Sequence, residues 1–191
     1  MAIHPSRTAH VLPWPERTSA VRHPPPSVLL IEAYEDTREL YHLWLTQRDF
    51  TVTGTASSDA ALAAVRCHVP DIIVAELMVP GGGVPLVRAL RATPGCRDTI
   101  LIVLTTQASG ALREHAVEAG ADCYLVKPCG VIQLGEAMVV ASRHRARLVT
   151  PDYGDRASSA RVRLAVARSR AIRDRLATSS WAAELSSDGL H

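Results

Sequence analysis

The chain alternates short apolar runs with longer segments in which apolar residues recur at helical spacing. A run that is apolar without alternation is typical of a strand buried on both faces, as in a parallel sheet. Strand character is found in residues 28–31, 50–55, 71–77, 99–104 and 122–126. The pattern therefore predicts five strands in one parallel sheet.

A predicted helix follows each predicted strand. The helical segments are residues 36–47, 58–67, 85–91, 109–119 and 131–147. Leu40, Leu43 and Trp44 give the first of them its apolar spacing, and Ser57 or Ser58 is a suitable N-cap for the second. Strict alternation of strands and helices predicts an α/β fold, a doubly wound parallel sheet covered on both faces.

The predicted strands and helices occupy residues 27–147, which we expect to form one domain. Residues 1–26 contain six prolines and no apolar signal region, and are predicted to be a disordered arm. Residues 148–191 form a predicted linker and an Arg-rich helical tail. No run approaches the roughly 18 apolar residues of a membrane span, so we expect a cytoplasmic protein.

Charge and cysteine content narrow the functional classes. The formal net charge is +2, which is too small to indicate nucleic acid as the partner of the whole chain. The four cysteines are widely spaced and form no paired CxxC motifs, so the sequence favours reduced thiols over a zinc site.

Ligands of open parallel sheets bind beyond the carboxyl ends of the strands. The residues found there are Glu32, Ala33, Glu76, Thr105 and Lys127. Lys127 is the only lysine among 21 basic Lys and Arg residues. Use of lysine in so Arg-biased a chain indicates that a compact ammonium matters at this position, with placement by chance as the alternative.

Four segments, residues 28–36, 71–81, 102–106 and 119–128, resemble in their order the receiver domain of two-component response regulators. The resemblance covers about residues 27 to 147 and implies a sheet in the order 2-1-3-4-5. In that family a histidine kinase transfers a phosphoryl group to an aspartate after the third strand. A metal ion held by acidic residues neutralises charge there, and electrostatic positioning supplies nearly all of the catalysis.

The resemblance places Thr105 at the family's phosphoryl-binding hydroxyl and Lys127 at its phosphoryl-binding lysine. It places Tyr124 at the aromatic residue that swings inward when the site is occupied. Two positions depart from the family. Glu76 stands in place of the phosphoacceptor aspartate, and Ala33 replaces the second acidic residue.

These departures weaken the expected site. Only Glu32 and Glu76 remain as metal ligands, because Ala33 has no carboxylate. We therefore expect no cofactor and at most weakened Mg²⁺ binding. The longer side chain of Glu76 shifts its carboxylate by roughly an ångström from the in-line geometry. Three interpretations stay open: Glu76 mimics the phosphorylated form, the site is retired, or Glu76 is still phosphorylated.

We therefore expect a single-domain, atypical response regulator, a pseudo-receiver, rather than an enzyme. It would act on signalling proteins, a histidine kinase or a downstream target, through its fourth helix, fifth strand and fifth helix, with a homodimer left open. Residues 157–177 predict a basic helix with a narrow apolar stripe of Val162, Ala165, Val166, Ile172 and Leu176. We expect that helix to pack on the domain or on a second copy. The alternative function is a nucleic-acid-associated regulator that uses this helix as its output.

Overall fold

The fold is seen in a computed structural model that describes residues 24–148 and Ile172, with side chains for 24–142 and for Ile172. Most of the predicted N-terminal arm, the linker from 149 and the predicted basic helix at 157–177, Ile172 excepted, lie outside the described residues. Among the described helices, none combines the length and apolar character needed to cross a membrane.

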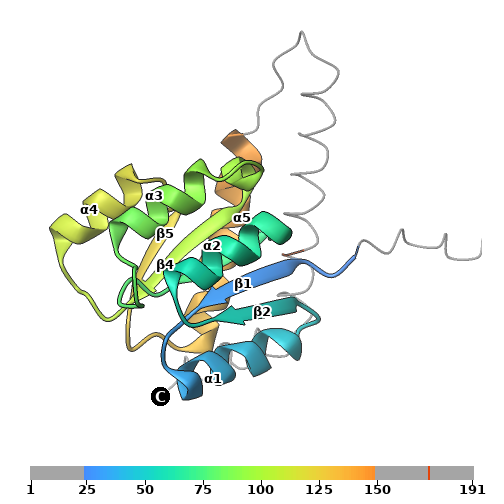
Figure 1. The fold of residues 1–191 in the computed structure, drawn as a ribbon. Helices are drawn as coiled ribbons and strands as arrows, with labels where there is room; N and C mark the ends of the chain where they lie inside the picture. Colours follow the sequence, from blue (N-terminus) through green and yellow to red (C-terminus); the bar gives the residue numbers. More distant parts are fainter. Residues whose placement is uncertain (1–23, 149–171, 173–191) are drawn as a thin grey trace, which may run out of the picture.

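The described chain folds around one five-stranded sheet with the strand order β2-β1-β3-β4-β5 (Figure 1). All four neighbouring pairs are parallel. The strands are β1 Ser27–Ile31, β2 Thr51–Thr55, β3 Ile72–Ala75, β4 Ile100–Thr105 and β5 Cys123–Val126. The predicted doubly wound fold and its 2-1-3-4-5 order are confirmed.

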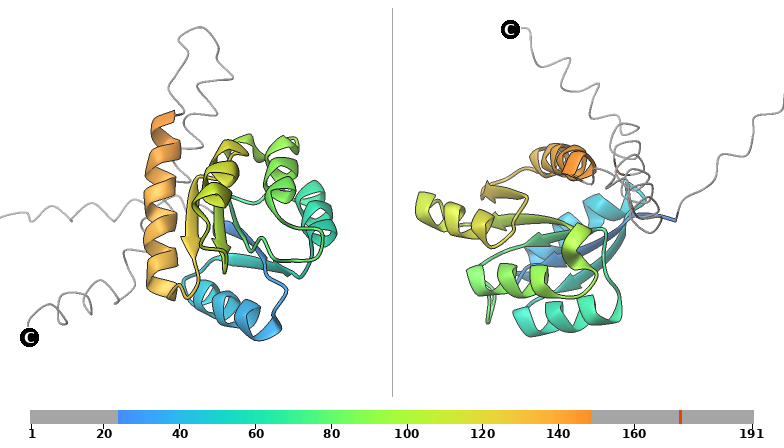
Figure 2. Two further views of the ribbon diagram at one scale, coloured as in Figure 1. Left: turned by 90° about the vertical axis from the view of Figure 1, so that its left-hand side faces the viewer. Right: turned by 90° about the horizontal axis from the view of Figure 1, so that it is seen from above.

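The helices form a layer on each face of the sheet. They are α1 Glu35–Thr46, α2 Ser58–Cys67, α3 Val84–Ala92, α4 Gly110–Glu118 and α5 Val131–Leu148, with a short 3-10 turn η1 at Cys96–Asp98. Helices α1 and α5 cover one face, and α2, α3 and α4 cover the other (Figure 2). The central strands β1, β3 and β4 are thus buried on both faces, which explains why their sequences are continuous apolar runs, whereas the edge strand β2 is largely exposed.

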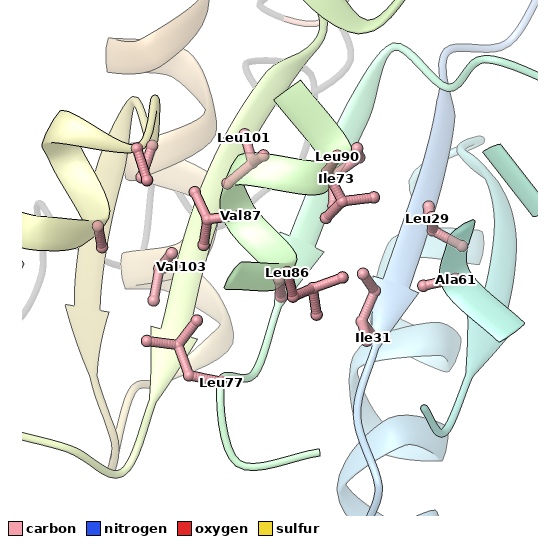
Figure 3. Close-up of a cluster of buried hydrophobic side chains, with 14 of the residues drawn as sticks. Leu29, Ile31, Ala61, Ile73, Leu77, Leu86, Val87, Leu90, Leu101 and Val103 are labelled. Carbon is pink, nitrogen blue, oxygen red and sulfur yellow. The ribbon is translucent and has the colours of Figure 1, made fainter. Parts of the chain in front are cut away.

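Alternation along the strands divides the core into two clusters. Leu29 and Ile31 of β1 point toward α2 and α3, where they meet side chains such as Ala61 and Leu86 (Figure 3). Val28 and Leu30 belong to the cluster beneath α1 and α5. Because successive side chains of a strand point to opposite faces, one short strand contributes to both cores.

The helix predicted for residues 36–47 is present as α1, but not all the residues that marked it face the core. Leu40 and Leu43 helped to predict this helix, but each is 58% exposed. The buried face is formed instead by Tyr41, Trp44 and Leu45. Those three residues lie at spacings of three and four, as a helix face requires. They place two aromatic side chains, Tyr41 and Trp44, in the core.

Serine side chains cap the N-terminal ends of two helices, α2 and α4. Ser57 is the N-cap of α2 and accepts a hydrogen bond from the backbone N–H of Ala60 at 3.3 Å. Ser109 caps α4 in the same way, with Leu112 as the donor. Each serine satisfies a backbone donor that the helix itself leaves unpaired.

Candidate functional site

Four polar side chains from four different strand ends meet at the carboxyl edge of the sheet. Glu32 follows β1, Glu76 follows β3, Thr105 ends β4 and Lys127 follows β5. The pairing of Ile31 with Ala75 puts the two glutamates side by side. The structure therefore brings together the residues that the sequence singled out at the ends of these strands, except for Ala33, whose side chain carries no polar atom.

Lys127 bridges the two glutamates. Its Nζ donates to Oε2 of Glu32 and lies 3.0 Å from Oε2 of Glu76. The side chains of Glu32, Glu76 and Lys127 are 2%, 4% and 13% exposed, respectively. Ion pairs removed from water in this way need their remaining polar atoms to be paired as well.

Backbone N–H groups satisfy the other carboxylate oxygens. Oε1 of Glu32 accepts from the N–H of Tyr34 at 2.9 Å, and Oε1 of Glu76 accepts from the N–H of Met78 at 3.0 Å. Both donors lie two residues beyond their glutamate, in the loops that follow β1 and β3. All four carboxylate oxygens of the pair thus have a hydrogen-bond or ion-pair partner.

Burial alone would raise the pKa of Glu76. Hydrogen bonds from the Thr105 side chain, from the backbone of Met78 and from Lys127 outweigh burial and lower that pKa below its ordinary value. Burial would likewise lower the pKa of Lys127, but its hydrogen bonds to Glu32 and Glu76 raise it above the usual lysine value. The ammonium and the Glu76 carboxylate therefore stabilise each other in their charged forms.

Thr105 and Tyr124 meet at Gln107, in the loop between β4 and α4. The backbone N–H of Gln107 donates to Oγ1 of Thr105 at 3.3 Å, and the hydroxyl of Tyr124 donates to the carbonyl oxygen of Gln107 at 2.8 Å. Tyr124 is buried, and its burial raises the pKa of the hydroxyl. The aromatic ring thus lies inward and is linked to the site through one loop residue.

The sequence reasoning missed Arg38 as a support of the site. Its guanidinium donates to the carbonyl oxygens of Glu32, at 2.8 Å, and Ala33, at 3.4 Å. A Cβ on Gly54 of β2 would lie 3.1 Å from Cδ of Arg38, so this glycine makes room for the arginine stem. Arg38 therefore fixes the loop after β1, although its side chain gives no sequence signal beyond a charge in the first turns of a helix.

The loop after β3 folds back on the end of its own strand. The N–H groups of Gly82 and Gly83 donate to the carbonyl oxygens of Val79 and Leu77, both at 2.8 Å. A Cβ on Gly82 would lie 2.4 Å from the carbonyl oxygen of Leu77, which leaves room only for glycine. This tight turn sets the position of the Met78 N–H, the donor to Glu76.

The donor set does not fit a dedicated Mg²⁺ site. Mg²⁺ requires near-octahedral oxygen ligands and is usually bound through one or two carboxylates together with several waters. Here Glu32 and Glu76 both direct Oε2 at Lys127, and Ala33 offers no side-chain oxygen. Within the part of the chain that the structure describes, no group of three or more His, Cys, Asp or Glu side chains is arranged to hold a metal ion.

Comparison with known proteins agrees with this geometry. The family model of the response regulator receiver domain matches residues 28–139. The chain is 36% identical over 105 residues to the transcriptional regulatory protein AfsQ1 of Streptomyces coelicolor, covering 54% of this chain and 45% of the relative. It is 30% identical over 123 residues to the phosphate regulon regulator PhoB of Rhizobium meliloti, covering 64% of this chain and 54% of that one.

Solved structures show the same fold. The chemotaxis response regulator CheY4 of Vibrio cholerae superposes with a TM-score of 0.58 at 24% identity, covering 61% of this chain and 98% of that one. A receiver domain of the sensor histidine kinase PA1611 from Pseudomonas aeruginosa, described with a magnesium ion in its active-site cleft, gives a TM-score of 0.56 at 24% identity, covering 63% of this chain and 98% of that one.

The chain belongs to the response regulator receiver domain family. It contains the receiver domain of two-component signalling, the resemblance carried by its strand ends. The chain spans about half the length of the curated relatives named above.

Proposed function

We propose that this chain is an atypical response regulator that acts without phosphorylation, with Glu76 in the place of a phosphorylated aspartate. The observation that carries the proposal is the state of the Glu76 carboxylate. It is buried, and it is bound by Lys127, by Thr105 and by the N–H of Met78. Each carboxylate oxygen of Glu76 already has a partner, which disfavours its attack on a phosphoryl donor.

The extra methylene of glutamate supports this interpretation. An aspartate at position 76 would hold its carboxylate nearer to the end of β3, further from Lys127. Glu76 instead brings negative charge to the two side chains that, by the family resemblance, grip a phosphoryl group. A fixed carboxylate bonded to both resembles an occupied site more closely than an empty one.

Tyr124 supports the same conclusion at the other end of the site. By the family resemblance, this aromatic residue turns inward when the site is occupied. Here it is buried and its hydroxyl is bonded to the carbonyl oxygen of Gln107 at 2.8 Å. The arrangement of Tyr124 is therefore the one expected of a receiver held in its occupied form by its own residues.

The output of such a domain is contact with another signalling protein, not catalysis. The surface formed by α4, β5 and α5 is the proposed contact face, because Tyr124 belongs to β5 and connects the site to that surface. Val117 of α4 and Val140 of α5 are large apolar side chains left exposed on these helices. A histidine kinase or a downstream target is the class of partner that the family suggests.

The test is phosphorylation by a small donor. The purified protein is incubated with Mg²⁺ and acetyl phosphate, and its intact mass is measured beside the double variant Ala33→Asp, Glu76→Asp. We expect the native chain to gain no phosphoryl group and the double variant to gain one. The single variants Ala33→Asp and Glu76→Asp are the matched controls, since each restores the family's aspartate at only one of the two positions.

A native chain that became phosphorylated would overturn the proposal, because Glu76 would then be a functional acceptor. A double variant that gained phosphate while the native chain did not would locate the difference at these two positions. Circular dichroism spectra of the native chain and the double variant check that both are folded before the comparison is made.

A further inference from the structure

A residue well beyond the family match is part of the receiver core. Ile172 lies past residue 139, where the match ends, and past Leu148, the last residue of α5. Its backbone is helical, and its side chain is 1% exposed. It belongs to the buried cluster between the sheet and the α1 and α5 layer. An exposed tail would leave such an aliphatic side chain in water.

The cluster that Ile172 joins lies under only two helices. Helix α1 contacts β1 and β2, whereas α5 contacts β4 and β5. The opposite face of the same sheet is covered by three helices, α2, α3 and α4. The face of α1 and α5 therefore has one covering element fewer for the same five strands.

A row of aliphatic side chains crosses this face at the amino-terminal ends of the central strands. Val28 of β1 pairs with Ile72 of β3, which pairs with Ile100 of β4. All three are buried members of the same cluster as Ile172. Such a row needs apolar cover to stay dry, and the described residues supply it from α1, Phe50, α5 and Ile172.

We propose that the C-terminal segment around Ile172 is an intramolecular docking element that completes the α1–α5 face of the receiver. Its partner is the chain's own cluster of Val28, Ile72 and Ile100 and their neighbours. The covalent link raises the effective concentration of the segment at that face, and the buried contact of Ile172 with the cluster is what holds it there, so docking should survive cleavage of the link.

The first test compares substitutions of equal chemistry at a buried and an exposed site. Ile172→Asp places a charge in the cluster, whereas Val140→Asp places one on α5 where the side chain is 64% exposed. We expect Ile172→Asp to lower the melting temperature by about 5 °C or more and to speed amide hydrogen exchange in α1 and α5. Val140→Asp should leave both nearly unchanged. Ile172→Ala, a milder change, should give a smaller loss of the same kind.

The second test separates docking from mere stability. A cleavage site for a specific protease is placed within residues 150–155 of the full chain, and the cut protein is run on gel filtration with light scattering. We expect the C-terminal fragment to stay with the receiver at the mass of one chain, also at high salt, because the contact is apolar. The fragment should separate when Ile172 is changed to Asp.

Release of the native fragment after cleavage, together with melting of Ile172→Asp at the native temperature, would overturn the proposal. Retention at the mass of two chains would also overturn it in its intramolecular form, since the segment would then dock on a second copy. These outcomes are independent of phosphorylation, so they stand apart from the test of Glu76.

Discussion

Lys127 and Glu76 meet although their strands are not neighbours. Lys127 follows β5 and Glu76 follows β3, with β4 between them in the sheet. Nζ of the lysine nevertheless lies 3.0 Å from Oε2 of the glutamate. The lysine side chain therefore crosses the end of β4, where Thr105 lies. Its ion pair with Glu76 joins the ends of two strands that are not adjacent in the sheet.

Replacing Lys127 tests how far the site depends on this bridge. Lys127→Met keeps an unbranched apolar stem but leaves the carboxylates of Glu32 and Glu76 buried without their cation. We expect the free energy of unfolding to fall by about 3–5 kcal/mol, because removing one partner of a buried ion pair leaves the other charge buried and uncompensated. Urea unfolding measures it, and Arg88→Gln, on the exposed side of α3, is the control. A loss no larger than that of the control would show that the bridge contributes little.

The lowered pKa of Glu76 makes stability depend on pH in a fixed direction. A carboxylate whose folded-state pKa is depressed stabilises the fold above its unfolded value, about 4.3, and this contribution is lost as pH falls through the folded pKa. At neutral pH, Glu76→Gln should therefore cost about 1.5–3 kcal/mol, the range for hydrogen bonds to charged groups.

The difference between native and Glu76→Gln proteins should shrink as the solution is acidified below that value. Denaturant unfolding at a series of pH values gives the two curves, and Glu39→Gln, on the exposed side of α1, reports the general effect of removing one negative charge. Curves that stay parallel down to strongly acidic pH would contradict the assignment of Glu76 as a stabilised carboxylate.

The third prediction connects Glu76 with Tyr124. If Glu76 holds the occupied form, Glu76→Ala frees Thr105 and lets Tyr124 leave its buried position. The pKa of the tyrosine hydroxyl, raised in the native chain by burial and also by the charge of Glu76, should then fall toward its ordinary value near 10, and Glu76→Gln shows how much of that fall comes from loss of the charge alone. NMR of ring-labelled tyrosine across alkaline pH measures this, with Tyr124→Phe to assign the signal. An unmoved Tyr124 signal would favour a retired site over a mimic.

The sequence was most informative where side chains themselves carry the signal. Continuous apolar runs identified β1, β3 and β4 because both faces of these strands are buried. The position of Glu32, Glu76, Thr105 and Lys127 just after their strands followed from the rule that parallel strands present their carboxyl ends at one edge. That Lys127 is the only lysine pointed to the same place from composition alone.

The remaining parts of the site depend on backbone atoms or on packing that the sequence does not show. The N–H groups of Tyr34 and Met78 and the two backbone atoms of Gln107 belong to residues of any type, so no pattern marks them. In α1, Leu40 fits the helical spacing as well as Leu45 does. Only the three-dimensional packing decides that Leu45 is buried and Leu40 is not.

The last prediction concerns Arg91 of α3, which ties together the ends of several elements. Its guanidinium donates to the carbonyl oxygens of Cys96 and Thr99, both at 2.8 Å, and of Gly120, at 2.7 Å, and it pairs with Asp122 at 3.1 Å. These bonds fix the amino-terminal ends of β4 and β5 against α3.

Arg91→Ala removes all of these donors at once and leaves Asp122 without this ion pair. We expect a loss of about 3–5 kcal/mol in the free energy of unfolding, as for other partly buried charged networks, measured by urea denaturation. Arg91→Lys should recover only part of it, because one ammonium cannot reproduce the planar fork of the guanidinium. The exposed Arg88→Ala on the same helix should change stability by less than about 0.5 kcal/mol. If both alanine variants unfolded alike, the role given to Arg91 would be wrong.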